Sequence, residues 1–154
     1  DSPGGSVKSG LSMVDVMRYI DCDIETINTG MAASMGSILL SSGTKGKRSS
    51  LNFSKVMIHQ VSSGAQGHVA DNRISQMESE KYNYILFKML AENSGKSFDE
   101  VLESARRDKW LNSQEALDFG FIDEIIITDK STPITGLLEG FDDYYAKEVL
   151  PHLK

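Results

Sequence analysis

The segment from residue 24 to residue 43 constrains the fold of this chain more than any other. Residues 24–28 are short, rich in β-branched side chains and roughly alternating, which predicts a strand. Residues 30–43 are small and apolar, with Met35, Ile38 and Leu39 at helical spacing, which predicts a tight turn and a buried helix. Such a strand–turn–helix unit is typical of α/β sheets.

The same alternation continues along the rest of the chain. Four further segments have the periodicity of regular structure: helices over 10–20 and 70–93, and strands over 55–59 and 121–127. The helix over 70–93 would be about 36 Å long, so part of it should project from a domain of this size. Alternating strands and helices predict an α/β fold with crossover connections.

Shorter signals predict where several helices begin and end. Gly95 suits the residue after the long helix, because glycine adopts the left-handed conformation without strain. Ser97 and Glu100 form a capping box that should open a short helix. Asn112 or Ser113 should cap another short helix.

The two ends of the chain differ in composition from the middle. Residues 1–5 form a Gly-rich turn with no element before it, and we expect residues to be missing on the N-terminal side. Residues 128–138 are predicted to be a loop, and residues 141–150 a short helix ended by Pro151. The chain is therefore divided into a domain over 1–127 and a C-terminal extension over 128–154, whose role the sequence does not indicate.

Charge and composition exclude several classes of function. Sixteen basic and 22 acidic side chains give a formal net charge of −6, which argues against nucleic acid as the partner. The one basic cluster, Lys45, Lys47 and Arg48, is short and is interpreted as a solvated loop. The longest uncharged stretch, residues 26–44, is too polar to span a membrane. The single cysteine, Cys22, fits a reducing compartment, and the cysteine spacing of a zinc site is absent.

Ser34 is a candidate nucleophile. A serine on a sharp strand-to-helix turn exposes its hydroxyl beside the free N–H groups of the helix start. Such a turn needs small neighbours, which Ala32, Ala33 and Gly36 supply. The alternative is that Ser34 only caps a buried helix.

A serine nucleophile needs a general base and a group that orients it. Of the three histidines, His59 ends an apolar strand, where catalytic groups lie in α/β folds, whereas His68 and His152 lie on segments expected to be exposed. His59 has the alternative of a hydrogen-bonded residue at the core edge. Asp108 is a candidate orienting acid, with an ion pair to a neighbouring base as the alternative.

Two Gly-containing segments are candidates for ligand contact. Gly4 and Gly5 precede a helix, and consecutive glycines there let backbone N–H groups face a ligand, although an ordinary turn is the alternative. Residues 43–47 look like a phosphate-binding loop, but Ser41 and Arg48 stand where that motif needs Gly and Ser or Thr. We therefore do not expect this chain to bind ATP itself.

Taken together, these motifs resemble the proteolytic subunits of Clp proteases, the ClpP family. The resemblance covers residues 1–127 and rests on four segments: 2–5, 30–36, 56–60 and 107–108 with the following 113–122. It implies a crotonase-like fold of repeated ββα units, with a projecting handle helix over about 70–93 and the N-terminal part of the fold missing from this chain. It also implies a tetradecamer of two stacked heptameric rings.

The resemblance assigns roles to individual residues. It implies that Ser34 is the nucleophile, His59 the general base and Asp108 the orienting acid, with the backbone N–H groups of Gly5 and Met35 forming an oxyanion hole. It implies a substrate-binding strand formed by Ser62, Ser63, Gly64, Ala65, Gln66 and Gly67. It implies ring–ring contacts through His68 and Arg107. Four residues depart from the family's usual pattern, namely Asp1, Val61, His68 and Arg106.

The function implied is an ATP-dependent serine endopeptidase core that hydrolyses unfolded polypeptides to short peptides inside a chamber. An AAA+ unfoldase such as ClpX, ClpA or ClpC would feed the chamber and hydrolyse the ATP, so no cofactor or metal is expected in this chain. The implied location is the cytoplasm, or an organelle matrix in a eukaryote, with no nucleic acid or membrane partner. The alternatives are a non-catalytic ring scaffold and a crotonase-fold acyl-CoA enzyme.

Overall fold

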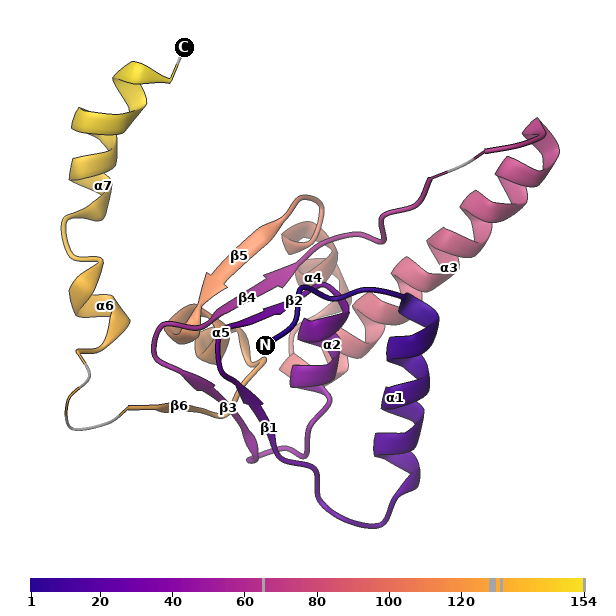
Figure 1. Ribbon diagram of the computed structural model, residues 1–154, viewed down its shortest axis with the longest axis horizontal. Coiled ribbons are helices and arrows are strands. Elements are labelled where there is room, and N and C mark those ends of the chain that lie inside the picture. Colours follow the sequence, from indigo (N-terminus) through magenta and orange to yellow (C-terminus); the bar gives the residue numbers. More distant parts are fainter. Residues whose placement is uncertain (65, 128–129, 131, 154) are drawn as a thin grey trace.

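The computed structural model describes residues 1–64, 66–127, 130 and 132–153, which form a mixed α/β fold (Figure 1). The strands of these residues are β1 (Thr26–Asn28), β2 (Met31–Ala33), β3 (Arg48–Leu51), β4 (Lys55–Ile58), β5 (Lys109–Asn112) and β6 (Glu124–Ile126). The helices are α1 (Val7–Tyr19), α2 (Met35–Ser41), α3 (Val69–Ser94), α4 (Phe98–Ser104), α5 (Ser113–Phe119), α6 (Ile134–Leu137) and α7 (Phe141–Tyr144). The predicted α/β class is confirmed.

The strands form two small sheets that are mostly parallel. One sheet has the order β1-β3-β6 and is parallel throughout. The other has the order β2-β4-β5, in which β5 runs antiparallel to β4. Ser2 pairs with Ala32 as a parallel bridge, so the N-terminal segment lies along the free edge of β2.

The core lies between the β2-β4-β5 sheet, the buried helix α2 and the inner end of α3 (Figure 1). Val56, Ile58 and Phe87 are among its most buried side chains. Helix α1 packs on α2 through the buried Gly10 and Val14. This packing fixes the ends of β2 and β4, which carry the candidate site.

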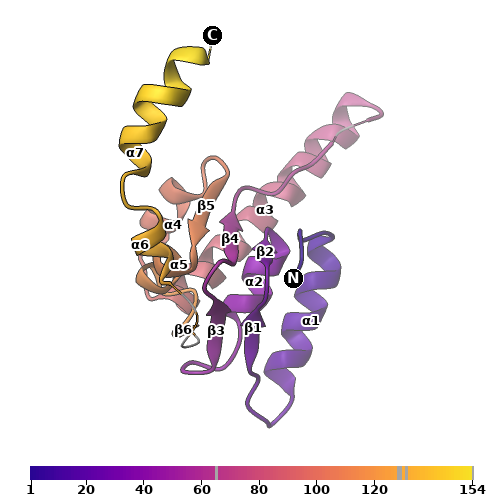
Figure 2. The same ribbon diagram turned by 60° about the vertical axis from the view of Figure 1, so that its left-hand side comes forward.

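Helix α3 has an inner part that is buried and an outer part that projects. Its buried residues begin at Asn83, and the helix ends at Gly95 in the left-handed conformation, as predicted. Ile74 and Met77 in the outer part are each 63% exposed, in agreement with the prediction that part of this helix projects. Two views show the outer part of α3 extending away from the sheets, on the opposite side of the molecule from α6 and α7 (Figures 1 and 2).

Several boundaries differ from the sequence prediction. Helix α1 begins at Val7 rather than at residue 10, because Ser6 caps it, with the Ser9 N–H donating to the Ser6 hydroxyl. The strands β2, β3 and β5 were not predicted. They are only three or four residues long, and β2 and β3 consist of Met-Ala-Ala and Arg-Ser-Ser-Leu, which have little intrinsic strand preference. Pairing with neighbouring strands, rather than local sequence, makes them strands.

The last predicted strand and the tail also differ. Strand β6 begins at Glu124 rather than at residue 121, because the Phe121 N–H still bonds the Ala116 carbonyl at the end of α5. Residues 134–137, predicted as loop, form the short helix α6. The predicted tail helix is present as α7 with a π-helical turn over Tyr145–Val149, but Pro151 lies within a 3₁₀ turn over Leu150–His152 rather than ending the helix. Residues 128, 129, 131 and 154 of the extension lie outside the described residues.

Arg48 corrects the prediction of a solvated basic loop. Its side chain is 1% exposed, while that of Lys45 is largely exposed. The Arg48 guanidinium donates to both carboxylate oxygens of Asp123, at 2.8 and 2.6 Å, and to the carbonyl oxygens of Ser41 and Asn93. The sequence prediction failed because the partner carboxylate is 75 residues away.

The hydrogen bonds from Arg48 lower the pKa of the Asp123 carboxyl to about 2. This network joins β3 to the ends of α2 and α3 and to the residue before β6. The Asp123 N–H also donates to the Arg48 carbonyl, so both the backbone and the side chain of Asp123 bind Arg48 directly before β6 begins.

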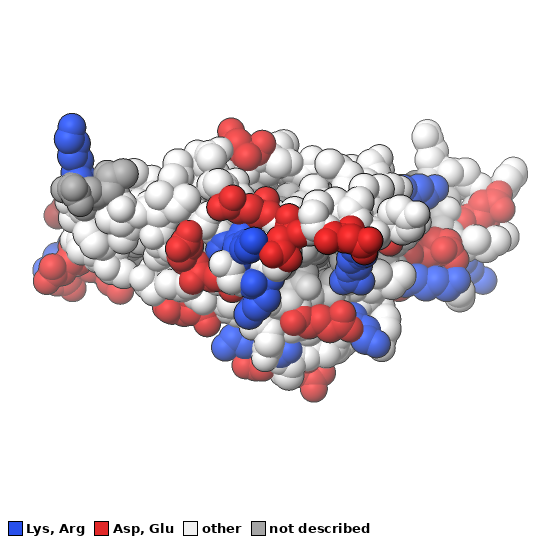
Figure 3. Space-filling model, turned by 90° about the horizontal axis from the view of Figure 1, so that it is seen from below, with Lys and Arg blue, Asp and Glu red and all other residues white. Residues whose placement is uncertain are grey.

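On the face seen from below, acidic and basic side chains are interleaved (Figure 3). Every helix in the described parts of the chain is too short or too polar to cross a lipid bilayer. Those residues also contain no group of three or more His, Cys, Asp or Glu side chains placed to hold a metal ion.

Candidate active site

Ser34 lies at the junction between β2 and α2. Its backbone φ is 54°, the one positive φ at a non-glycine residue in the described structure. A non-glycine residue in this region stores about 1–3 kcal/mol of strain, which the surrounding structure must offset. The Ser34 N–H donates to the Met57 carbonyl at 2.9 Å, which ties the turn to the neighbouring strand β4.

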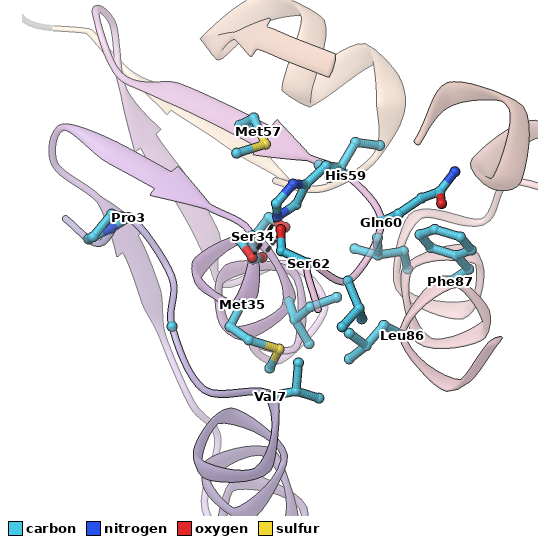
Figure 4. Close-up of a pocket in the computed structure, with 16 residues that line it drawn as sticks. Pro3, Val7, Ser34, Met35, Met57, His59, Gln60, Ser62, Leu86 and Phe87 are labelled. Carbon is cyan, nitrogen blue, oxygen red and sulfur yellow. Dashed lines mark hydrogen bonds between the residues drawn. The ribbon is translucent and has the colours of Figure 1, made fainter. Parts of the chain in front are cut away.

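The Ser34 side chain does not cap α2. Its hydroxyl instead lies 2.9 Å from Nε2 of His59, and Figure 4 shows the two side chains pointing toward each other. The alternative of a simple helix cap is therefore wrong. The strained backbone presents the hydroxyl to an imidazole, as a strand-to-helix nucleophile turn does.

His59 directly follows the buried strand β4, as predicted for a residue at a strand end. Its Nδ1 lies 3.4 Å from a carboxylate oxygen of Asp108. With the proton on Nδ1, Nε2 is free to accept the Ser34 hydroxyl proton and the Nδ1–H faces the carboxylate. The structure thus brings Ser34, His59 and Asp108 into one line.

Asp108 is the loosest member of this line. The Nδ1–Oδ1 separation is longer than that of a well-formed hydrogen bond, and the Asp108 side chain is 65% exposed. Among the described residues, the ion pair found for Asp108 is the one with His59, not one with a neighbouring base. Asp108 is thus placed to orient the imidazole, in a setting where water screens its charge.

The N-terminal glycines pass directly over the Ser34 turn. A Cβ on Gly4 would lie 2.6 Å from the Ser34 Cβ, so only glycine fits there. The segment is held in place by backbone bonds between Ser2 and the strand β2, and by the Asp1 carboxylate, which accepts from the Met31 N–H at 2.9 Å. The close approach of two chain segments explains the glycine at position 4.

The two predicted oxyanion-hole residues line the same pocket as Ser34. Met35 is the first residue of α2, so its N–H has no partner within the helix. Gly5 adopts a φ of 152° with open space around it. The pocket has a volume of about 270 Å³. Its apolar lining includes Val7, Ile38, Val61, Leu86, Phe87 and Leu90, and Figure 4 labels Val7, Leu86 and Phe87.

The predicted substrate-binding segment follows the pocket wall. Ser62 lines the pocket, and Ser63 and Gly64 continue from it without regular structure. Gln66 and Gly67 are exposed, while Ala65 lies outside the described residues. A segment outside any sheet can add a peptide by backbone pairing, which is the role predicted for these residues.

Sequence reasoning missed two side chains that hold the residues after His59. The Gln60 side chain donates to the Arg106 carbonyl at 3.3 Å, which joins this segment to the loop that carries Asp108. The buried Asn83 of α3 accepts from the Val61 N–H at 2.6 Å. The two contacts span 46 and 22 residues of sequence, so no local motif indicates them.

The two residues predicted for ring–ring contact lie outside the pocket. His68 precedes α3 at the outer end of the projecting helix and is exposed. Arg107 is exposed in the loop between α4 and β5, next to Asp108. Their role in contact between rings stays a prediction.

A strained serine turn, an imidazole and a carboxylate in line, and an adjoining pocket are the arrangement of a serine hydrolase on an α/β fold. The model of the Clp protease family matches residues 1–129, and this chain belongs to that family.

Curated relatives agree with this assignment. The chain is 50% identical over 127 residues to the ATP-dependent Clp protease proteolytic subunit of Bacteroides fragilis strain ATCC 25285, which covers 82% of this chain and 61% of the relative. It is 47% identical over 127 residues to the protein of the same name from Bacteroides thetaiotaomicron, covering 82% of this chain and 58% of the relative. The chain therefore spans about three fifths of the length of these relatives.

Proposed function

We propose that this chain forms the catalytic core of a serine endopeptidase that cleaves unfolded polypeptides into short peptides. The observation that carries the proposal is the 2.9 Å contact between the Ser34 hydroxyl and His59 Nε2, made from a strained turn beside a pocket. Membership of the Clp protease family and the relatives' name, proteolytic subunit, support it.

In the proposed mechanism, the Ser34 Oγ attacks a peptide carbonyl while its proton moves to Nε2 of His59. The negative charge that develops on the carbonyl oxygen is bound by the N–H groups of Gly5 and Met35. His59 then gives the proton to the leaving amine, the C–N bond breaks and an acyl-enzyme forms. Water, deprotonated by His59, hydrolyses the ester and frees Ser34. Asp108 orients the imidazole and stabilises its cation.

The substrate is proposed to be an extended peptide. Its backbone would pair with the segment 62–67, and one apolar side chain would fill the pocket beside Ser34. Because backbone pairing reads few side chains, selectivity has to arise from control of access to the site. The name of the relatives includes ATP dependence, and we assign the ATP to an AAA+ partner of the ClpX, ClpA or ClpC type rather than to this chain.

We further propose that the chain acts in a tetradecamer of two heptameric rings in the cytoplasm. The support is family membership and the projecting part of α3, whose Ile74 and Met77 are exposed in the single chain. Exposed apolar side chains on an outlying helix favour contact with another copy. His68 and Arg107 are proposed to take part in that contact.

The test is labelling of the whole protein by a fluorophosphonate, read by intact mass. We expect one label per chain, lost in Ser34→Ala and retained in Ser12→Ala, a control at an exposed serine on α1. The non-catalytic scaffold predicts no label in the wild type. The acyl-CoA alternative predicts thioester turnover without a label on Ser34. Either result would overturn the proposal.

A further inference from the structure

The segment that leaves His59 has no strand partner of its own. From Gln60 to Gly64 the chain is without regular structure, yet Val61 and Ser62 form part of the pocket wall beside Ser34. Backbone N–H groups that are partly buried need a partner, and outside a sheet that partner has to come from a side chain or water. Side-chain hydrogen bonds therefore have to hold this part of the pocket wall in place.

Asn83 supplies the partner for the Val61 N–H. Its Oδ1 accepts from that N–H at 2.6 Å, and the Asn83 side chain is 8% exposed. The Asn83 Nδ2 donates to Glu80 one turn earlier on α3, at 3.3 Å, which sets the orientation of the amide. Asn83 is also the first buried residue of α3, at the point where the helix meets the body.

The bond lies two residues beyond His59 and thus sets the direction in which the chain leaves the site. The Gln60 side chain anchors the same segment on its other side, to the Arg106 carbonyl. Ser34, His59 and the glycines 4 and 5 are held by other contacts, between β2, β4 and the N-terminal segment. Loss of the Asn83 bond would therefore loosen the pocket wall more than the reacting groups.

We propose that Asn83 is a positioning residue for substrate: it holds the wall formed by Val61 and Ser62 in the conformation that binds an extended peptide. The inference rests on the proposed peptidase function. Removing one such hydrogen bond should raise the KM for a peptide by about 2–10-fold, with a smaller change in kcat. The rate of Ser34 labelling by a small fluorophosphonate, which does not use the wall, should stay within about twofold.

The first experiment measures kcat and KM for a fluorogenic peptide with an apolar residue at the cleavage site, together with the labelling rate, on the whole protein. Asn83→Ala should raise KM. Asn83→Asp combined with Glu80→Gln keeps an oxygen at the acceptor position without placing two carboxylates side by side, and it should remain near the wild-type KM. Glu78→Gln, an exposed acid on the same helix that pairs with Lys81, is the matched control and should keep the wild-type KM.

Val61→Pro provides a second variant, because proline has no N–H for Asn83 to accept. If the bond is the cause, Asn83→Ala should add no further increase in KM in the Val61→Pro background. An unchanged KM in Asn83→Ala, an equal loss of labelling and peptidase rates, or the same increase in both backgrounds would overturn the proposal.

Amide hydrogen exchange of Val61 separates this proposal from the proposed function. The Val61 amide should be protected in the wild type and in the combined variant Asn83→Asp with Glu80→Gln, and it should exchange at least tenfold faster in Asn83→Ala. This difference in exchange rates is expected even if the protein does not react with the fluorophosphonate. Absence of labelling would overturn only the proposed peptidase function. Equal exchange in the wild type and Asn83→Ala would overturn the role of Asn83.

Discussion

The structure contains two charged arrangements that differ in how tightly they are held. The pair of Arg48 and Asp123 is enclosed, with exposed side-chain fractions of 1% and 15% and short bonds to both carboxylate oxygens. The line of Ser34, His59 and Asp108 is more open, and its acid lies 3.4 Å from the imidazole with 65% of its side chain exposed. The first arrangement joins distant elements of the fold, whereas the second leaves its members able to adjust.

The contrast shows that a carboxylate beside a basic group has different consequences at different depths. Largely enclosed and hydrogen-bonded through both carboxylate oxygens, Asp123 has a lowered pKa, and its loss would leave the buried Arg48 guanidinium without a carboxylate partner. Exposed and loosely paired, Asp108 should contribute little to folding. We therefore expect substitutions of Asp123 to change stability, and substitutions of Asp108 to change activity.

The largest effect is expected from Asp123→Ala. It leaves the buried Arg48 charge unpaired, which should lower the free energy of unfolding by about 3–5 kcal/mol. The measurement is a urea melt followed by circular dichroism. The paired change Arg48→Met with Asp123→Leu removes both charges and should be less destabilising than Asp123→Ala alone. A wild-type midpoint for Asp123→Ala would show that the network does not stabilise the fold.

Asp108→Asn should lower activity and leave stability unchanged, the opposite of Asp123→Ala. It keeps the side chain's shape but removes the charge that faces His59, so kcat/KM for a peptide should fall by about 10–10²-fold. The urea midpoint should not change, because the side chain is exposed. Asp118→Asn on α5, another exposed acid, serves as the control with unchanged activity. A shifted urea midpoint with full activity in Asp108→Asn would show that Asp108 contributes to stability rather than to activity.

The pH dependence of stability should follow Asp123. Its pKa is about 2 in the folded protein and ordinary when unfolded, so the unfolded state binds the proton more tightly. The stabilisation is complete above about pH 5 and is lost as the pH falls from about 4 to 2, a change of about 1–2 kcal/mol after allowance for solvent screening. Urea melts between pH 2 and 6 measure it. The paired variant without Arg48 and Asp123 should lack this part of the pH dependence, and an identical profile would contradict the assignment.

The smallest effect is expected at Lys47, next to Arg48 in the sequence. Its ammonium group binds Asp23 at 2.9 Å, and this contact raises the pKa of Lys47, but both side chains are at least half exposed. Lys47→Ala should therefore produce no measurable change in the urea midpoint. A shift in the urea midpoint as large as that of Asp123→Ala would show that burial does not explain the difference between the ion pairs of Lys47 and Arg48.

The elements with strong local signals could be predicted from the sequence. The long helix, predicted over 70–93 and observed over 69–94, has the periodicity, the length and the terminal glycine that mark a helix independently of its surroundings. The capping box of Ser97 and Glu100 and the cap at Asn112 are local as well, and both are confirmed. The short strands β2, β3 and β5 lack such signals and depend on the strands beside them.

The residues of the candidate site also fall into those that the sequence could indicate and those that it could not. Ser34 could be proposed from the small residues around a predicted strand-to-helix turn, and His59 from its position at the end of an apolar strand, and the family motifs added Asp108. The contacts of Asn83 and Gln60 could not be proposed, since each joins segments that meet only when α3 and the α4–β5 loop pack against the body. A polar side chain in the middle of a helix, as at Asn83, or in an irregular segment, as at Gln60, carries no indication of a partner until the neighbouring backbone is in place.

By itself, then, the sequence determined the α/β class, the long projecting helix, and the serine and histidine at strand ends. These depend on local periodicity, on the small residues around Ser34 and on short motifs. Only the tertiary structure decided that Arg48 is buried, that α3 is enclosed from Asn83 onward and exposed before it, and that Asp108 is only loosely engaged. These outcomes follow from burial and from pairing over long sequence distances, because the free energy of a charge or hydrogen bond depends on its surroundings in space.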